Sequence, residues 1–424
     1  MSIVGCRWFR SAGRAAFVAA AALLAAAPGF AETPAVATFT KDVAPILQEH
    51  CQSCHRSGSM APMSLVTYEE VRPWARSIKA KVVAREMPPW HIDRTVGIQD
   101  FKNDISLSER EIATISTWAD GGAPMGDPKD LPVKQWPSDE IWRIADSQGR
   151  PPDLIVKSTA WTQPAEGQDE WWEPAVSTGL SEDRWVKAVE IRPSLKGRRI
   201  VHHAIGIVEY APGKAGEVYP ENTGRLLRAG GSINFSVHYH SVGETITDQV
   251  EVGVWLYPKT YVPKYQVKTG ALGSQEARKV LDIPPGKVTV HNTYIPLTEP
   301  TMLLSFQPHM HTRGKAMSME AIYPDGHVEM LSYVSRFSFN WHVNYVYADT
   351  ATPLLPKGTV IHITAWHDNT AANKANPDPT QWVGWGQRSF DEMFHCNVTL
   401  INLPQDEFEK RVQERQNTTR LASR

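Results

Sequence analysis

The sequence predicts a multidomain protein in which a small all-α domain is followed by two all-β domains, each an antiparallel sandwich. Helical spacing of apolar residues ends near residue 128, whereas from Trp185 onward short β-branched and aromatic runs alternate with Gly/Pro turns. A chain of 424 residues is long enough for several domains. The predicted boundaries are 1–31 for an export signal, 34–128 for the helical domain, 129–165 for a linker that ends in the first strand, 166–285 and 286–405 for the two sandwiches, and 406–424 for a charged, helical C-terminal tail.

The first residues have the composition of a Sec-type signal peptide. Arg7, Arg10 and Arg14 form a positively charged start, and Ala15–Ala27 is an apolar run. Gly29-Phe-Ala31 supplies the small residues expected before a cleavage site. The run is too short to cross a bilayer, so the mature protein is expected to have no membrane span. We therefore expect a periplasmic or secreted protein.

The charge balance argues against nucleic acid as a partner. The formal charge of the whole chain is −2, and removal of the three signal-peptide arginines leaves −5. A nucleic-acid-binding protein needs a basic face, which this composition does not indicate.

Three helical stretches are predicted in the first domain. Thr40 is placed to cap a helix that carries Val43, Ile46 and Leu47 on one face. A second stretch covers Tyr68–Ala84 and is interrupted near Pro73, and a third covers Ser106–Ala119. Gly121-Gly122 ends the third helix.

The segment Cys51-Gln-Ser-Cys54-His55 has the spacing of a covalent haem attachment site. The two thiols can add to the two vinyl groups of one porphyrin, and the histidine that follows them is placed to ligate the iron. A thioredoxin-like pair would need a βαβ pattern, and a zinc site would need a second CxxC; neither is present. The sequence thus predicts one haem c in a small c-type cytochrome domain.

Methionine residues are candidates for the sixth position on the iron. Met87, in a stiff Met-Pro-Pro segment, is the first choice because a thioether opposite histidine suits electron transfer. Met60 and Met63 compete with it, although they follow His55 closely. The alternative for all three is packing in the core.

Several runs after residue 184 are typical of strands. They are separated by turns such as Pro285-Gly286 and Pro356-Lys-Gly358. The runs are Trp185–Ile191, Ile200–Val208, Ile233–Tyr239, Val250–Leu256 and Thr359–Trp366.

The histidines of this region occur in three close clusters: His202-His203, His238-Tyr-His240 and His309-Met-His311. Residues i and i+2 of a strand share a face, so each HxH motif can offer two imidazoles to one ion. Adjacent histidines face opposite sides and can share a metal only at a twisted or bulged strand. The clustering therefore predicts metal binding.

Copper is the favoured ion. Imidazole suits zinc and copper equally, but a thioether ligand prefers Cu(I) and a redox partner is predicted on the same chain. The expected cofactors are one covalent haem c and two copper ions.

The arrangement resembles the copper type II ascorbate-dependent monooxygenases, which include dopamine β-hydroxylase and peptidylglycine monooxygenase. The resemblance covers residues 152–405 and implies two consecutive β-sandwiches with one copper each. It implies that His202, His203 and His238 hold the electron-storing copper. It also implies that His309, His311 and Met393 hold the copper at which oxygen is activated. The segment 368–373 and Trp385-Gly386 are similar to the stretch that leads up to this methionine.

The chain departs from that family in several ways. It lacks the disulfides of the animal members, and the stretch from His203 to His238 is short. Gln307 and Asn397 stand where the amidating enzyme has a substrate-clamping arginine and a tyrosine, so a peptidylglycine substrate is not expected.

Other polar groups lie near the predicted ligands. We expect Cys396 to be a buried apolar group, and His240 is a candidate for a residue that supports a metal-binding histidine without binding the metal itself. Three further histidines, His342, His367 and His395, are candidates for the same supporting role, but we expect surface or core placement for each of them.

Together these features predict an exported copper monooxygenase that hydroxylates a C–H bond of an unidentified small organic substrate with O2. The haem domain would pass electrons from a periplasmic donor to copper. One alternative is a periplasmic haem–copper electron-transfer or copper-binding protein without turnover. Another is a copper reductase for a small nitrogen oxide, which would need a cysteine-ligated copper.

Overall fold

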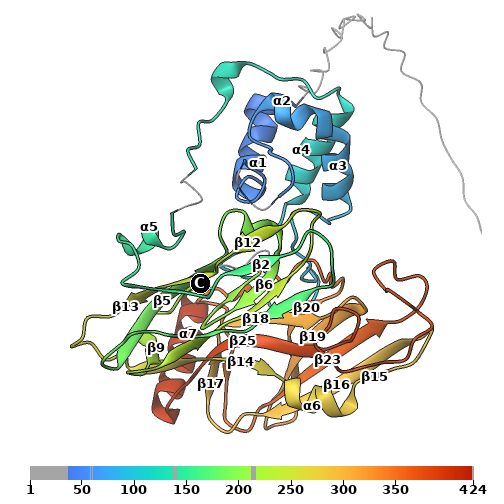
Figure 1. Ribbon diagram of the computed structural model, residues 1–424. Coiled ribbons are helices and arrows are strands. Elements are labelled where there is room, and N and C mark those ends of the chain that lie inside the picture. The colour runs from blue at the N-terminus through green and yellow to red at the C-terminus, as the bar shows by residue number, and fades with distance from the viewer. Residues whose placement is uncertain (1–36, 58, 60, 137–140, 212–215, 423–424) are drawn as a thin grey trace, which may run out of the picture. The chain divides into compact units, whose positions relative to one another are not determined.

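A computed structural model describes residues 37–57, 59, 61–136, 141–211 and 216–422 (Figure 1). The predicted export signal and Met60 lie outside these residues. The chain divides into residues 1–36 and a unit of residues 37–424, and only the second unit is described below. That unit consists mostly of β-strands with a few short helices, as expected for all-β domains.

Short helices form the first described segment. They are α1 (Ala44–His50), preceded by a π-helical turn (Phe39–Val43), and α2 (Tyr68–Val71), α3 (Ala75–Val83) and α4 (Glu109–Asp120). The predicted interruption near Pro73 is a 3₁₀ turn at Arg72–Trp74. The helices enclose a small apolar core in which Phe39, Leu47, Ile115 and Trp118 are fully buried.

The helix starts are fixed by side chains, although not by the residue expected for the first helix. Glu70 and Glu111 complete capping boxes at α2 and α4. Thr40, predicted as the first cap, is instead buried within the opening turn, and its hydroxyl finds no hydrogen-bond partner among the described residues. The residue before the turn is Thr38, whose backbone N–H donates to the Asp42 carboxylate at 2.7 Å. The prediction for Thr40 was therefore wrong.

The first half of the β region has its own apolar core. A four-stranded sheet, β3-β11-β6-β7, and the run β1-β13-β5-β9 of an eleven-stranded sheet contribute its buried side chains. The strands of this half are β1 (Leu154–Lys157), β2 (Trp161–Gln163), β3 (Glu170–Trp172), β4 (Ala175–Ser177), β5 (Arg184–Arg192), β6 (Val201–Ile205), β7 (Glu209–Tyr210), β8 (Gly216–Val218), β9 (Thr223–Leu227), β10 (Ser232–Asn234), β11 (Ser236–Tyr239), β12 (Ile246–Asp248) and β13 (Glu251–Leu256).

The second half builds a separate core between the antiparallel sheet β16-β23-β19-β20 and the strands β17, β18 and β25. Helix α6 (Ser274–Val280) and Ile283 also belong to this core, ahead of the predicted boundary at residue 286. The remaining strands are β14 (Tyr265–Leu272), β15 (Asp282–Ile283), β16 (Val288–Pro296), β17 (Thr301–Leu303), β18 (Ser305–Met310), β19 (Gly314–Ile322), β20 (Val328–Val334), β21 (Tyr345–Val346), β22 (Leu354–Leu355), β23 (Val360–Asp368), β24 (Val383–Gly384) and β25 (Phe394–Asn402).

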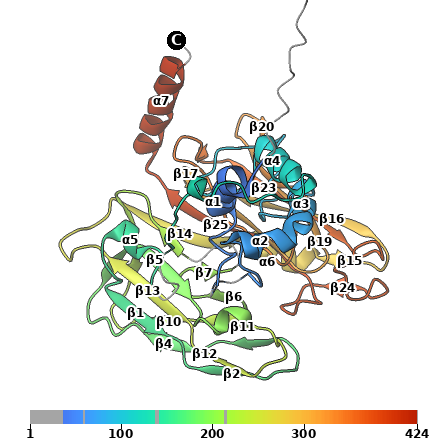
Figure 2. The same ribbon diagram turned by 90° about the horizontal axis from the view of Figure 1, so that it is seen from above.

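One sheet continues through both halves. Strand β14 pairs in parallel with β9 of the first half and antiparallel with β25 of the second half. The C-terminal helix α7 (Gln405–Ala422) then returns to the first core, where Phe408 is buried (Figure 2). The predicted helical tail is thus confirmed.

The segment after α3 also packs into the second core. Trp90 is 7 % exposed, and its ring lies 4.7 Å from that of Tyr345. Ile92 forms a β-bridge with Val334, and Phe101 stacks on Tyr347. Part of the predicted helical domain is therefore built into the second β half.

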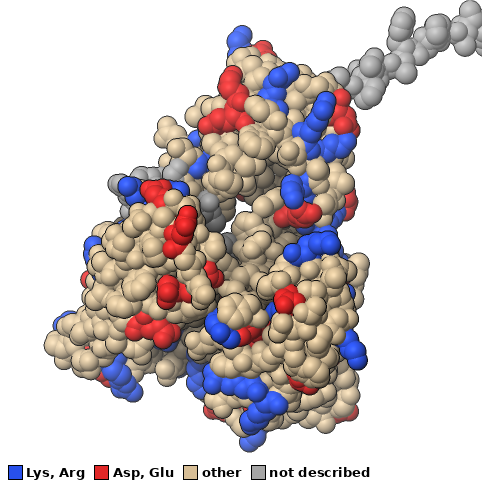
Figure 3. All heavy atoms as spheres, turned by 45° about the vertical axis from the view of Figure 1, so that its right-hand side comes forward, with Lys and Arg blue, Asp and Glu red and all other residues tan. Residues whose placement is uncertain are grey.

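The charges on the surface and the lengths of the helices can be described for the residues that the structure covers. Figure 3 shows acidic and basic side chains interspersed over the face that it draws, with no broad basic area on that face. Among the described residues, no helix is both long enough and apolar enough to cross a membrane.

Candidate metal centre

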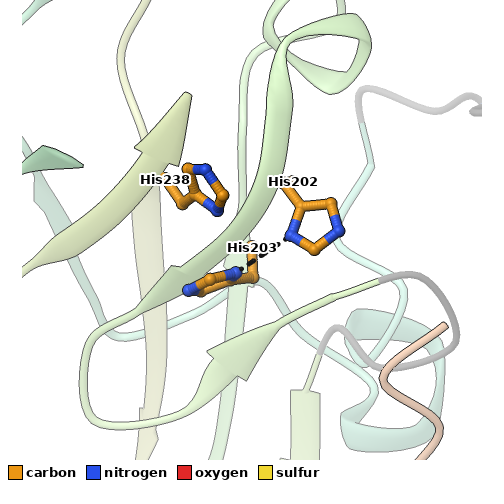
Figure 4. Close-up of side chains that lie close together, drawn as sticks. All are labelled: His202, His203 and His238. Atoms are coloured by element: carbon orange, nitrogen blue, oxygen red, sulfur yellow. Dashed lines mark hydrogen bonds between the residues drawn. The ribbon is translucent and has the colours of Figure 1, made fainter. Parts of the chain in front are cut away.

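The first histidine group is created by a β-bulge. His238 of β11 pairs with His203 of β6, but the next residue, Tyr239, pairs with Val201, so His202 is the extra residue. A bulge re-aims a side chain, which allows these adjacent histidines to lie together. One ring nitrogen from each of His202, His203 and His238 lies within 4.8 Å of the other two (Figure 4). The bulge is the strand distortion that two adjacent histidines need if they are to bind the same ion.

The nitrogens of this group suit a metal ion. Nδ1 of His202 lies 3.2 Å from Nδ1 of His203. Two nitrogens bound tetrahedrally to one ion at about 2.0 Å lie roughly 3.3 Å apart. Nδ1 of His238 is buried and has no hydrogen-bond partner among the described residues. A buried unpaired nitrogen is costly, and coordination removes that cost.

Asp169 orients the group from behind. Its carboxylate accepts hydrogen bonds from Nε2 of His238 at 2.9 Å and from Nδ1 of His240 at 2.7 Å. The first bond leaves Nδ1 of His238 as the nitrogen with a free lone pair, an arrangement common behind metal-binding histidines. Burial alone would raise the pKa of Asp169, but these two bonds outweigh it and lower the pKa. Nothing in the sequence pattern singled out Asp169, because it precedes a short strand far from the histidines.

The second group, His309, His311 and Met393, lines one pocket. His309 lies on β18, which pairs with β25 so that His309 faces His395 and Met310 faces Phe394. Met393 directly precedes β25, beside the end of β18. The pocket has a volume of about 420 Å³ and is also lined by His203 of the first group. The structure thus brings the second group and one histidine of the first group, His203, to the same cavity.

Glu392 holds the ends of these two strands together. Its buried carboxylate accepts the backbone N–H groups of His311 at 2.8 Å, Arg313 at 2.6 Å and Met393 at 3.2 Å. Burial raises the pKa of Glu392 to about 7, against the effect of these three bonds. The carboxylate therefore fixes two of the predicted ligands relative to each other.

The segment 368–378 braces the same corner. Nε of the buried Arg313 donates to the Asn369 side chain at 2.9 Å, and the Asn373 amide donates to the Thr312 carbonyl at 3.1 Å. These contacts attach the segment to the residues that follow His311. The segment therefore supports the loop that follows His311.

Further histidines join the two groups. The ring centroid of His203 lies 6.4 Å from that of His309, and His395 stacks on His309 at 4.5 Å. His342 is fully buried, and its ring lies 5.4 Å from that of His202 and 4.9 Å from that of His309. The core placement expected for His342 is confirmed, but it lies among the predicted ligands.

His367 supports the thioether segment from the other side. It is fully buried, as its expected core placement required, and its Nε2 lies 3.3 Å from the Met393 carbonyl oxygen.

Burial keeps these imidazoles neutral. It is the main cause that lowers the pKa of His202 and of His311 to about 4, and the neighbouring histidines add to the effect on His202. The pKa values of His203, His309 and His342 are lowered well below the usual value for the same reason. A neutral imidazole is the form that binds metal, so no proton must be removed before binding near pH 7.

Three other predicted residues have clear positions. Cys396 is fully buried on β25, as expected. Asn397 lines the pocket, whereas Gln307 is buried and donates to the Glu209 carboxylate and, at 3.1 Å, to the His342 carbonyl.

The haem attachment segment lies beside the helical core. Cys51 and Cys54 are free, half-buried thiols. The Nδ1 of His55 lies 3.2 Å from the Met63 carbonyl oxygen, so Nδ1–H donates and Nε2 keeps the lone pair that an axial ligand needs. This geometry suits the predicted role of His55.

The methionines divide between different surroundings. The Met63 side chain packs against the helical core. Met87 lines a separate cavity of about 250 Å³ together with Trp90 and Arg94. Cys51, Cys54 and His55 are not among the residues that line this cavity, so the role of Met87 as sixth ligand stays a prediction.

Replacement of Glu392 by alanine is expected to loosen the second group. Three buried backbone N–H groups would lose their acceptor, at roughly 1–3 kcal/mol each in the free energy of unfolding. Urea unfolding of Glu392→Ala measures this loss, and the exposed Glu276→Ala serves as the control. Equal stability of the two variants would contradict the assigned role of Glu392.

The metal-free protein is expected to lose stability as the pH falls from 6.5 toward 4. The folded pKa values of His202, His311 and His395 are about 4, below the unfolded value of 6.5, so the unfolded chain binds more protons in this window. Each histidine contributes up to about 3 kcal/mol. Glu392 acts in the opposite direction, because its raised pKa makes its contribution fall as the pH rises from 4.5 toward 7.

Urea titrations of the metal-free protein between pH 4 and pH 7.5 measure the net effect. A stability that stays constant or rises on acidification would mean that these imidazoles are not held neutral.

Comparisons with known proteins leave the chain without an assigned family. No protein-family model and no curated protein matches it. Three solved structures show weak likeness at 11% identity. A two-domain protein of unknown function from Bacteroides fragilis has a TM-score of 0.17, with 63% of this chain and 100% of that chain covered. A putative alpha-L-fucosidase from Bacteroides ovatus has 0.14, with 64% and 42% covered. A protein of the infectious bursal disease virus Gx strain has 0.18, with 59% and 73% covered, and scores this low carry no inference.

Proposed function

We propose that this protein is an exported, haem c-containing copper monooxygenase that hydroxylates a C–H bond of a small organic substrate with O2. One copper would be held by His202, His203 and His238, and the other by His309, His311 and Met393. When bound, copper supplies one-electron chemistry and the activation of oxygen.

The observation that carries this proposal is the meeting of two unlike donor sets at one pocket. An all-imidazole group suits an ion that changes oxidation state, whereas a thioether favours Cu(I). His203 belongs to the first set and lines the same cavity as His309, His311 and Met393. A volume of about 420 Å³ lies within the range of about 300–1,000 Å³ that is typical of small-molecule sites.

The residues around the pocket supply positioning. Asp169 and Glu392 hold histidines of the two sets, and Ser389, close to Met393 in the chain, donates to Asp169 at 3.1 Å. Trp171 stacks on His238 at 4.1 Å and lines the cavity. Trp385 also lines it, with the guanidinium of Arg278 4.1 Å from its ring centroid. These rings and the aliphatic Ile207 and Val398 give the substrate an apolar wall.

The haem attachment segment is proposed as the source of electrons. A haem held at Cys51, Cys54 and His55 would carry single electrons and has no evident reaction of its own, which motivates this role.

The Met393→Leu variant tests the monooxygenase. We expect it to retain the haem spectrum and the first copper while the oxygen-dependent product falls at least about 100-fold, because loss of one ligand disables the second site. Met319→Leu, a buried methionine of the same core, is the control. Product formation, oxygen uptake and copper per chain are measured with a broad panel of small substrates. Bound copper without an oxygen-dependent product would favour the carrier function instead.

The Cys51→Ala/Cys54→Ala variant tests the electron supply. We expect reduction of the coppers by a periplasmic cytochrome or quinol donor to slow at least about tenfold, because the haem is the proposed acceptor of the first electron. Stopped-flow absorbance follows the reduction, and ascorbate, which can act directly on copper, serves as the control donor. Unchanged reduction by the protein donor would exclude a relay role for the haem.

A further inference from the structure

His342 occupies the space between the two histidine groups. It lies in the connection between β20 and β21, is fully buried, and makes ring contacts with His202 and His203 of the first group as well as with His309 of the second. Its Nδ1 lies 3.2 Å from Nδ1 of His309, and its Nε2 has no hydrogen-bond partner among the described residues.

The Nδ1 pair of His202 and His203 belongs to a three-histidine group that could hold an ion, whereas the pair of His309 and His342 belongs to no such group among the described residues. We therefore interpret the second contact as a hydrogen bond, which requires a proton. A neutral imidazole carries one N–H, so at 3.2 Å one ring must donate and the other must accept. A lone pair facing a lone pair would be repulsive. The direction of this bond decides which nitrogen of His309 keeps its lone pair.

His311 shows the direction used by the neighbouring ligand. Its Nδ1 lies 3.1 Å from the Asp391 carbonyl oxygen, which can only accept, so Nδ1 carries the proton and Nε2 is free. The same assignment at His309 would give the second group two Nε2 lone pairs and the Met393 thioether.

The loop that carries His342 is held by the strand that carries His309. The Gln307 side chain donates to the His342 backbone carbonyl at 3.1 Å, and Gln307 lies two residues before His309 on β18. Asn103 donates to the Asn344 carbonyl at 2.7 Å on the other side of the loop. The His342 ring is therefore held against His309 by the backbone.

We propose that His342 is a positioning residue that accepts the Nδ1–H of His309 and so reserves Nε2 of His309 for the metal. Its ring then also links the second group to His202 and His203. The inference rests on the proposed function for the identity of the ion, but the bond itself belongs to the metal-free protein.

Nitrogen-15 spectra of histidine-labelled, metal-free protein test the bond directly. The His309 resonances, identified by their absence in His309→Gln, are expected to show the Nδ1–H tautomer. His342→Asn places an amide oxygen near the position of Nδ1 and should preserve this tautomer. His342→Leu removes the acceptor, and His342→Gln moves it toward the position of Nε2, so both should shift His309 toward Nε2–H.

Copper binding provides the second measurement. In chelator competition, His342→Leu should lower the affinity of the second site for copper by about 10–100-fold, as is usual when a residue hydrogen-bonded to a metal ligand is lost. His342→Asn should stay within about threefold of wild type. His362→Leu, a histidine of β23 that bonds Glu320 and Asn292 instead, is the control for loss of an imidazole.

The outcomes separate this inference from the proposed function. A wild-type His309 in the Nε2–H tautomer, or a His342→Leu variant that matches wild type in both measurements, would overturn the role of His342. A wild-type chain that binds fewer than two coppers while His309 keeps Nδ1–H would support the bond and overturn the proposed two-copper enzyme.

Discussion

The need to satisfy imidazole nitrogens inside an apolar environment governs the construction of this protein. Burial excludes water and disfavours the charged form of a ring, so each buried nitrogen must find a partner. Asp169, the Asp391 carbonyl and the neighbouring rings supply partners on one side of the ligand histidines. Among the described residues, the buried ring nitrogens left without a partner are Nε2 of His202, Nδ1 of His238 and Nε2 of His342, all in this cluster. The free Nδ1 of His238 is the lone pair that an ion in the first group would use.

The sheet that runs through both halves places this cluster. Two sandwiches joined only by a linker would leave the distance between their histidines undefined. Here the pairing of β14 with β9 on one edge and β25 on the other makes the halves parts of one hydrogen-bonded sheet. The register of β18 against β25 then aligns His309 with His395 and brings Met393 to the end of the ligand strand. Glu392 completes the alignment with three backbone bonds.

The strand-rich region and the histidine clusters were predictable because they depend on local sequence patterns. Tyr68–Ala84 was predicted with its break at Pro73, and the bulge condition for His202 and His203 was stated from strand geometry alone. The sequence showed no signal for Asp169 or Glu392, because their importance arises from contacts between distant segments. Likewise, Trp90 follows a helical stretch, and only tertiary packing reveals that it belongs to the second β core.

The C-terminal helix has a consequence for the order of folding. Leu403 and Phe408 belong to the core of the first half, although they are encoded near the end of the chain. Domains usually fold one after another as synthesis proceeds. Here the core of the first half is complete only when the last segment is present. Under the proposed function, metal loading would therefore follow completion of the whole chain.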